Sequence, residues 1–181
     1  MSKTNMMKAL LCVAVATAMS APLSASAQTM NTPAASALVK ADQQIVIGMA
    51  QANIAEIEAA KLALANSQNA EVKAYAQKMI DDHTKALADV TTLAQNKGVT
   101  LPTKPDAKHK AMAAKLSKLK GDKFDKMYMQ QAGVQDHKHV HAMLKKDQAR
   151  AKDADVKALA AKMMPTVEEH LATATSKPAA K

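Results

Sequence analysis

Apolar residues recur along the chain at the three- and four-residue steps that are typical of helices. From about Ser36 to Asn66 the only helix-breaking residue is Gly48. A second stretch with the same spacing covers 69–97. It begins with Asn69, a residue type that caps helices, and it is followed by Gly98, a residue type that ends them. The pattern therefore predicts two long helices joined by a short turn.

The second half of the chain repeats this arrangement after a break. Residues 99–105 contain two prolines, which cannot continue a helix, and this segment predicts a connector. A short helix follows and ends near Gly121. A third long helix is predicted over 122–151, and a fourth begins at the capping residue Asp153. Pro165 lies inside the fourth helix and predicts a kink there.

Two of these predicted helices begin with similar sequences. Residues 69–79 read NAEVKAYAQKM and residues 153–163 read DADVKALAAKM, identical at seven of eleven positions. Each copy is followed by two acidic residues and a histidine. Two helical hairpins related in this way and joined by a proline-containing crossover predict an all-α fold, a ferritin-like four-helix bundle over residues 38–175. The last residues, 176–181, are expected to be disordered.

The composition agrees with a single helical domain. The chain has 181 residues, with one Phe, two Tyr, no Trp, four Gly and six Pro. So few aromatic and turn-forming residues exclude an all-β fold, which needs many short strands and tight turns. The length excludes a multidomain enzyme.

The first 27 residues have the three parts of a secretory signal peptide. Two lysines near the N-terminus precede the apolar run 9–18, and small residues follow at 24–27. Cleavage is expected after Ala27, which would leave 28–37 as a flexible leader and place the protein in the periplasm. The apolar run is too short to span a bilayer, and no later run is apolar enough. A transmembrane segment is therefore not expected.

Cysteine and charge narrow the classes of function. Cys12 is the one cysteine and lies in the predicted signal peptide, so disulfides, thiolate metal sites and thiol catalysis are excluded for the mature chain. The net charge is +9, and the segment from Lys104 to Lys126 contains eight lysines but only three aspartates. This run predicts a solvated helix face or, alternatively, contact with anionic envelope components. Nucleic-acid binding is not expected, because Arg150 is the only arginine and no aromatic residues alternate with the lysines.

Several short motifs carry a resemblance to a known family. They occur in the order AEIEAAKLA (55–63), VKAYAQKMIDDH (72–83), GVTLP (98–102), FDKMY (124–128), QDH (135–137) and MMPTVEEH (163–170). Together they resemble domain-of-unknown-function family 4142, which contains bacterial ferritin-like domains, over roughly residues 42–174. The resemblance implies an exported, ferritin-like helical bundle. It implies no reaction.

Each long helix has one polar residue among the positions predicted to face the interior, and these four residues are the candidates for a functional site. The four residues are Glu56, His83, His137 and His170. Because ferritin-like bundles build metal sites from side chains on facing helices, these residues are the predicted ligands of one transition metal ion, iron, zinc, copper or manganese. Further candidates are the acids beside the histidines and a histidine one helical turn from His137. These are Asp82, Asp136, His141 and Glu169.

The alternative is a non-catalytic envelope or stress-related protein. In that interpretation the same histidines and acids form a buried hydrogen-bond layer across the bundle. The Glu-x-x-His pair of di-iron carboxylate proteins is absent, because Ile80, Val134 and Val167 stand three residues before the three histidines. Ferroxidase or oxygenase chemistry is therefore not expected, and no catalytic residues are predicted. The sequence indicates no organic cofactor and no particular oligomeric state.

Overall fold

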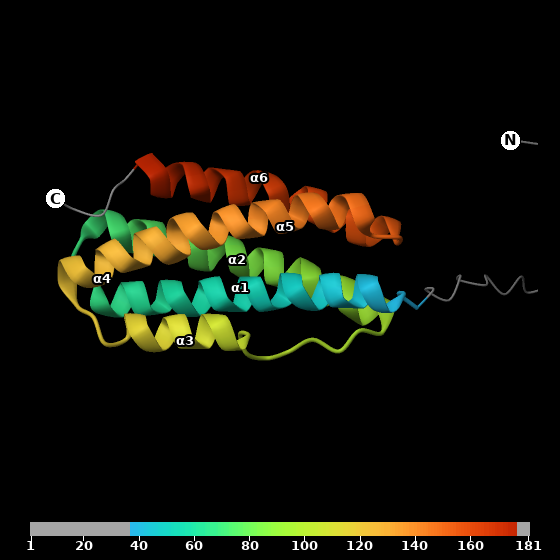
Figure 1. Ribbon diagram of the computed structural model, residues 1–181, viewed down its shortest axis with the longest axis horizontal. Coiled ribbons are helices and arrows are strands. Elements are labelled where there is room, and N and C mark those ends of the chain that lie inside the picture. The colour runs from blue at the N-terminus through green and yellow to red at the C-terminus, as the bar shows by residue number, and fades with distance from the viewer. Residues whose placement is uncertain (1–36, 177–181) are drawn as a thin grey trace, which may run out of the picture. The chain divides into compact units, whose positions relative to one another are not determined.

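All secondary structure in residues 37–176, which are the residues that the computed structural model describes, is helical. The predicted all-α class is confirmed for this part of the chain. The predicted signal peptide and nearly all of the predicted leader and tail lie outside the described residues. In chain order the helices are α1 (Lys40–Asn66), α2 (Ala70–Lys97), α3 (Ala107–Leu116), α4 (Gly121–Tyr128), the π-helix η1 (Met129–Asp136), α5 (His137–Arg150) and α6 (Ala154–Ser176) (Figure 1).

Local sequence signals set the ends of the first hairpin. The Asn69 side chain accepts hydrogen bonds from two backbone N–H groups in the first turn of α2. Gly98 ends the same helix with φ of 67°, a left-handed conformation that glycine adopts without steric cost. α1 begins at Lys40, a few residues later than the pattern predicts. Val39 before it is extended and makes no side-chain cap.

The third long helix departs from the expected regular α-helix. α4, η1 and α5 follow one another without a loop over residues 121–150, but the middle segment is a π-helix. Such segments are rare and occur often at functional sites. Gly133 in this segment lies so close to α6 that a Cβ added to it would stand 2.9 Å from the Cβ of Ala174. The π segment ends directly before His137, the first residue of α5.

The start of the fourth long helix is held by two aspartates. The Asp153 carboxylate accepts the backbone N–H groups of Asp155 and Val156, which confirms the predicted cap. Asp42 of α1 is buried, and its carboxylate accepts the backbone N–H groups of Lys152 and Asp153. This contact joins the beginning of α1 to the beginning of α6. Pro165 lies within α6, which is helical on both sides of it.

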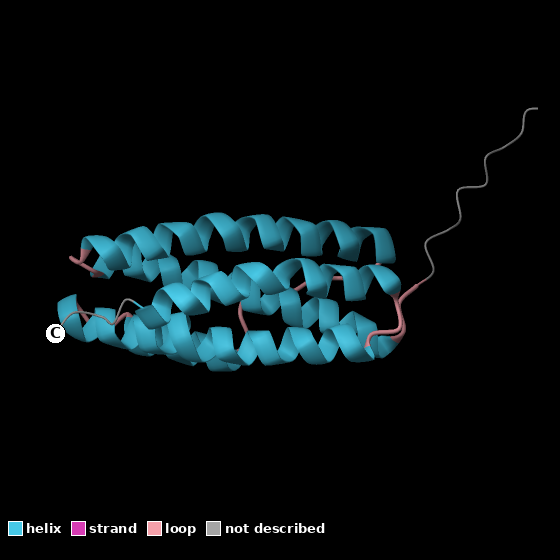
Figure 2. Ribbon diagram, turned by 90° about the horizontal axis from the view of Figure 1, so that it is seen from above, coloured by secondary structure: helices cyan, strands magenta, loops and turns pink. Residues whose placement is uncertain are grey.

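The interior consists of two apolar clusters with a polar layer between them. α1 packs against α2, α5 packs against α6, and α2 also contacts α6. The long helices run side by side (Figure 2). One apolar cluster includes Val46, Val90 and Leu144, and the other includes Ala60 and Tyr128. Between these clusters lie buried polar side chains from all the long helices, Asn53, Glu56, His83, His137 and His170.

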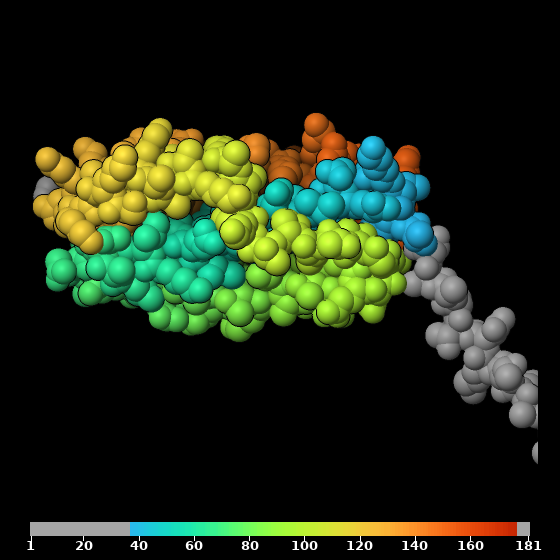
Figure 3. Space-filling model, turned by 90° about the horizontal axis from the view of Figure 1, so that it is seen from below, coloured from blue at the N-terminus to red at the C-terminus, as the bar shows by residue number. Residues whose placement is uncertain are grey.

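The lysine-rich part of the chain is a solvent-facing surface. α3 packs alongside α1, and Figure 3 shows the face on which the connector and α3, in yellow-green, lie beside α1, in blue to teal. All eight lysines between Lys104 and Lys126 are exposed. Among the helices of residues 37–176, none has a stretch that is long and apolar enough to cross a membrane.

Candidate metal site

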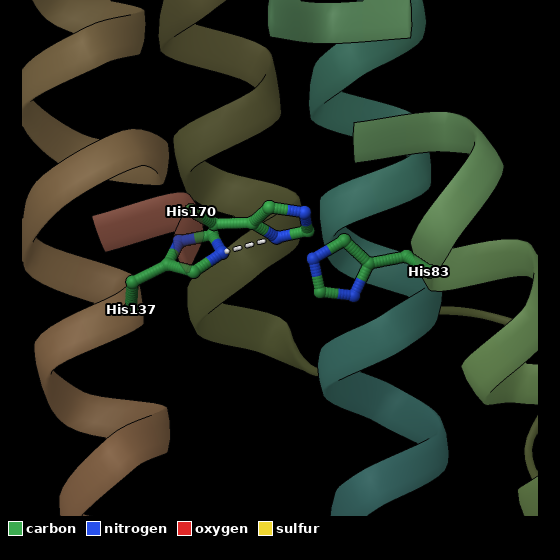
Figure 4. Close-up of side chains that lie close together, drawn as sticks. All are labelled: His83, His137 and His170. Carbon is green, nitrogen blue, oxygen red and sulfur yellow. Dashed lines mark hydrogen bonds between the residues drawn. The ribbon is translucent and has the colours of Figure 1, made fainter. Parts of the chain in front are cut away.

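Three buried histidines from three helices converge in the polar layer. His83 of α2, His137 of α5 and His170 of α6 are 6%, 1% and 0% exposed. One ring nitrogen from each lies within 4.8 Å of a ring nitrogen from each of the others. Figure 4 shows the three rings turned toward one another. The three nitrogens are thus close enough together to be candidate ligands of a single metal ion, and His83, His137 and His170 are called the histidine triad from here on.

A buried amide fixes the orientation of His83. The Asn53 Nδ2 donates to the backbone carbonyl of Met49, at 2.8 Å, so its Oδ1 faces the other way. That Oδ1 lies 2.9 Å from His83 Nδ1. Because an amide oxygen can only accept, Nδ1 of His83 carries the proton. Its Nε2 then has a free lone pair, and this buried atom has no hydrogen-bond partner among the described residues.

The π-helix supplies the corresponding partner of His137. Its Nδ1 lies 2.8 Å from the backbone carbonyl oxygen of Ala132 in η1. A carbonyl oxygen only accepts, so this nitrogen also carries the proton. The Nε2 of His137 therefore presents a lone pair, directed at His170 Nδ1 across 3.3 Å.

His170 lies between a carboxylate and another imidazole. Its Nε2 is 3.0 Å from Asp82 Oδ2, and its Nδ1 faces the lone pair of His137. When Asp82 accepts the Nε2 proton of a neutral His170 ring, Nδ1 is left with a lone pair. The triad then directs three nitrogen lone pairs at one point, an arrangement that a cation stabilises. A hydrogen bond from Nδ1 to His137 in addition to the one from Nε2 to Asp82 requires a proton on both nitrogens of His170, because a neutral ring has only one N–H.

Burial favours the neutral forms of the histidines. It lowers the pKa of His137 from 6.5 to about 4. Burial, together with the neighbouring imidazoles, lowers the pKa of His83 well below its ordinary value. Burial also lowers the pKa of His170, against the hydrogen bond to Asp82, which raises it. Neutral imidazoles are the form that binds metals, so the triad needs little deprotonation at pH 7.

Glu56 lies behind His137 and not among the three converging rings. Its Oε1 is 3.8 Å from His137 Nδ1, the nitrogen that points away from His170. Its Oε2 is buried and has no hydrogen-bond partner in the described part of the chain. Burial, with a contribution from Asp136, raises the pKa of this carboxyl well above its ordinary range. Glu56 is thus a neighbour of His137 and not a fourth member of the converging group.

The structure distributes the remaining predicted ligands around the site. Asp82 contacts His170, as described above, and it also pairs with Lys78 of its own helix at 2.9 Å. Asp136 points toward α3, where Lys108 Nζ lies 3.1 Å from its Oδ1. The other two pair with residues of neighbouring helices at the surface. They are His141, 3.1 Å from Glu168, and Glu169, 3.1 Å from Lys78.

The family model described as domain of unknown function DUF4142 matches residues 26–176, which is most of the chain. This chain is a member of the DUF4142 family. The match confirms the resemblance that the dispersed motifs indicate. A search of proteins with curated functions gives no match to this DUF4142 chain.

Two solved structures resemble the DUF4142 chain in fold. A DUF305 fragment from Deinococcus radiodurans aligns with a TM-score of 0.69 and 18% sequence identity, covering 77% of this chain and 96% of that one. CopM in the Cu(I)-bound form aligns with a TM-score of 0.61 and 16% identity, covering 75% of this chain and 93% of CopM. At this level of identity the likeness concerns the fold alone.

Sequence reasoning about this DUF4142 member misses the groups that orient the histidines. Asn53 stands three residues before Glu56, on the same helix face, so the helical spacing itself could have placed it in the polar layer. The role of Ala132 is different, because a backbone carbonyl carries no side-chain signal and the π-helix that presents it has no simple sequence pattern. Asp82 is the one candidate that contacts a member of the triad as a hydrogen-bond acceptor.

Proposed function

We propose that this protein binds one transition metal ion through His83, His137 and His170. The observation that carries the proposal is the set of outer hydrogen bonds to Asn53, Ala132 and Asp82. Each can take one ring proton, so that each histidine offers its other nitrogen to a common point. Such second partners fix the tautomer and orientation of metal-binding histidines, and their presence around a buried triad favours a ligand set over an accidental cluster.

Copper is the first metal to test, and zinc is the second. The donors are neutral imidazoles, which suit copper, zinc and iron, whereas manganese prefers oxygen ligands. Iron is less favoured here because Glu56, the buried carboxyl, stands behind His137. Among divalent first-row metals a nitrogen site binds copper most tightly. That CopM, a protein of similar fold, is known in a Cu(I)-bound form adds support for testing copper first.

The proposal also includes the compartment in which the protein acts and the arrangement of its helices. The protein is expected to be exported to the periplasm after cleavage at Ala27, and to hold the ion there as a metal-binding or metal-buffering protein. We also propose that α1, α2, the continuous 121–150 segment and α6 are the four helices of a ferritin-like bundle. The repeated sequence at the starts of α2 and α6 supports this correspondence.

The test is the metal content of protein purified without a histidine tag. We expect close to one copper or zinc ion per chain after reconstitution, and loss of that ion in His83→Ala and His170→Ala. The matched control is His139→Ala, because His139 is exposed and lies outside the triad. Native protein that takes up no metal, or triad variants that keep it, would contradict the proposal.

One observation favours the alternative of a hydrogen-bond layer without metal. His137, His170 and Asp82 already form a continuous chain of hydrogen-bond contacts. In that case replacing a triad histidine would lower stability, metal content would be zero in every variant, and the exposed lysines of α3 would be the region to test for contact with anionic envelope components. Metal analysis on the native chain separates the two proposals.

A further inference from the structure

A cavity of about 160 Å³ opens between α2 and α6 beside the histidine triad. Of the triad, His83 lines this cavity, as do Asn53 and Asp82, which orient two of the histidines. Ala86, Met163 and Thr166 form part of the remaining wall. A cavity of this volume has room for a few water molecules or for one small ligand.

The opposite side of the polar layer is much more tightly closed. The cavity next to Glu56, between α1, α3 and η1, has a volume of only about 10 Å³, roughly the space of one water molecule. His137 and His170 are 1% and 0% exposed. The α2–α6 side is therefore the side from which a small molecule can approach the triad.

His83 is also the least restrained of the three ligands. His137 and His170 each make contacts through both ring nitrogens. His83 makes one, to Asn53, and its Nε2 is unpartnered within residues 37–176. The ring that borders the cavity is thus the ring that can adjust when a ligand arrives.

An exposed ion pair bridges the two helices that form the cavity. Lys162 Nζ of α6 lies 2.8 Å from Asp89 Oδ2 of α2, and the two side chains are 65% and 40% exposed. Both residues line the cavity. Ion pairs with this degree of exposure contribute little to stability, so the bridge separates at low cost and does not seal the cavity.

We propose that the α2–α6 cavity is a ligand subsite of the metal centre, where a small anion or a small nitrogen base completes the coordination of the ion beside His83. The inference rests on the proposed metal site. Three protein ligands leave an open position on a four-coordinate ion, which is the arrangement of reactive metal sites and not of closed structural ones. The cavity supplies the space for the fourth ligand, whereas the cavity beside Glu56 holds no more than about one water molecule.

The test uses azide and the copper(II)-loaded protein. Azide bound to copper(II) gives a charge-transfer absorption band, so titration gives its affinity directly. Ala86→Phe and Thr166→Phe would each fill the cavity with an aromatic ring while leaving the triad and its partners unchanged. The matched control is Ala158→Phe, because Ala158 is exposed and lines a different depression on the α2–α6 surface.

The expected result is an azide band in the native protein and in Ala158→Phe, and an affinity at least about tenfold weaker in the two cavity variants, all with one copper ion per chain. A native copper protein that gives no azide band, or cavity variants that bind azide as the native chain does, would overturn the subsite and leave the metal site intact. Failure to bind copper at all would overturn both.

A second measurement does not depend on filling the cavity. In His83→Gly, free imidazole can enter through the α2–α6 cavity and replace the missing ring. We expect added imidazole to restore copper binding in His83→Gly and not in His137→Gly, because His137 is enclosed. Equal rescue of the two variants, or rescue of neither, would contradict an open side at His83.

Discussion

Asp82 Oδ2 lies 3.0 Å from His170 Nε2, and the two residues come from α2 and α6. The carboxylate therefore sets which nitrogen of His170 is free to face the other two histidines. Burial raises the pKa of Asp82, but hydrogen bonds from Lys78 and His170 outweigh this and lower it overall. Asp82 is thus an anion at neutral pH.

Replacing this anion should weaken metal binding without removing a ligand. We expect Asp82→Asn to lower copper affinity by about 10- to 100-fold, the range found when partners of metal-binding histidines are changed. Competition with a chelator of known affinity measures the effect. The control is Asp81→Asn, since Asp81 is exposed and interacts with Gln77 of its own helix. An unchanged affinity in Asp82→Asn would remove Asp82 from the site.

Glu56 should make the metal-free protein less stable at higher pH. Its pKa is raised in the folded state, so between its ordinary value and the raised value the folded chain binds more protons than the unfolded chain. Stability from this group is present at low pH and is lost as the pH rises. Glu56→Gln removes the ionisation, and we expect it to stabilise the metal-free protein by about 1–3 kcal/mol at pH 8 and by less at pH 5.

Urea unfolding of both proteins at the two pH values tests this expectation. A Glu56→Gln variant that is equally destabilised at pH 5 and pH 8 would mean that the carboxyl accepts a specific hydrogen bond in its ionised form. Glu58→Gln on the same helix is the control, because Glu58 is exposed.

The triad histidines should have the opposite effect on acid stability. The pKa of His137 falls from 6.5 to about 4 on folding, so the unfolded chain binds the extra proton in this interval. Stability is fully present above pH 6.5 and is lost as the pH falls toward 4, by up to about 3 kcal/mol for this residue alone. His83 and His170 are shifted in the same direction.

Equilibrium unfolding of metal-free protein between pH 7 and pH 4.5 measures this loss. His139→Gln should keep the full dependence, since His139 is exposed. A stability that does not change across this interval, in a protein that stays folded, would show that the folded and unfolded chains bind the same number of protons, so that folding does not lower the pKa values of the triad.

The π-helix should tolerate no side chain at Gly133. An added Cβ would stand 2.9 Å from the Cβ of Ala174 and 3.6 Å from the hydroxyl of Tyr75, so α6 would have to move. We expect Gly133→Ala to destabilise the protein by about 1–3 kcal/mol in spite of the better helix propensity of alanine. Gly48→Ala is the matched control, because an added Cβ there meets nothing within 4 Å, and it should stabilise by about 0.5–1 kcal/mol. If Gly133→Ala also stabilised the protein, the close approach of η1 and α6 would be wrong.

Features that depend on local chemistry could be predicted from the sequence. Asn69, Gly98 and Asp153 each act through their own backbone or their nearest neighbours, so their residue types suffice to place helix ends. The inward rows of the helices follow from spacing, and this brought His83, His137 and His170 correctly into the interior. His170 stands three residues further along its repeat than His83 does, about one turn, and both reach the same layer.

Features that depend on packing between distant segments could not be predicted in this way. The π-helix forms where Gly133 lies against Ala174, a contact between residues far apart in the chain. The position of Glu56 behind His137 depends on the rotation of α1 relative to α5, which helical periodicity does not fix to within one side chain. His141 shares a helix face with His137 by spacing, yet it pairs with Glu168 at the surface.

The three histidines come from α2, α5 and α6, and even the nearest two, His137 and His170, are 33 residues apart along the chain. No short segment of the polypeptide carries the ligand set, and an unfolded chain offers only scattered single imidazoles. The proposed site therefore exists only in the folded chain. An ion bound there would be acquired in the compartment where the chain completes its fold, and the metal supply of that compartment would act together with the three imidazole donors to select it.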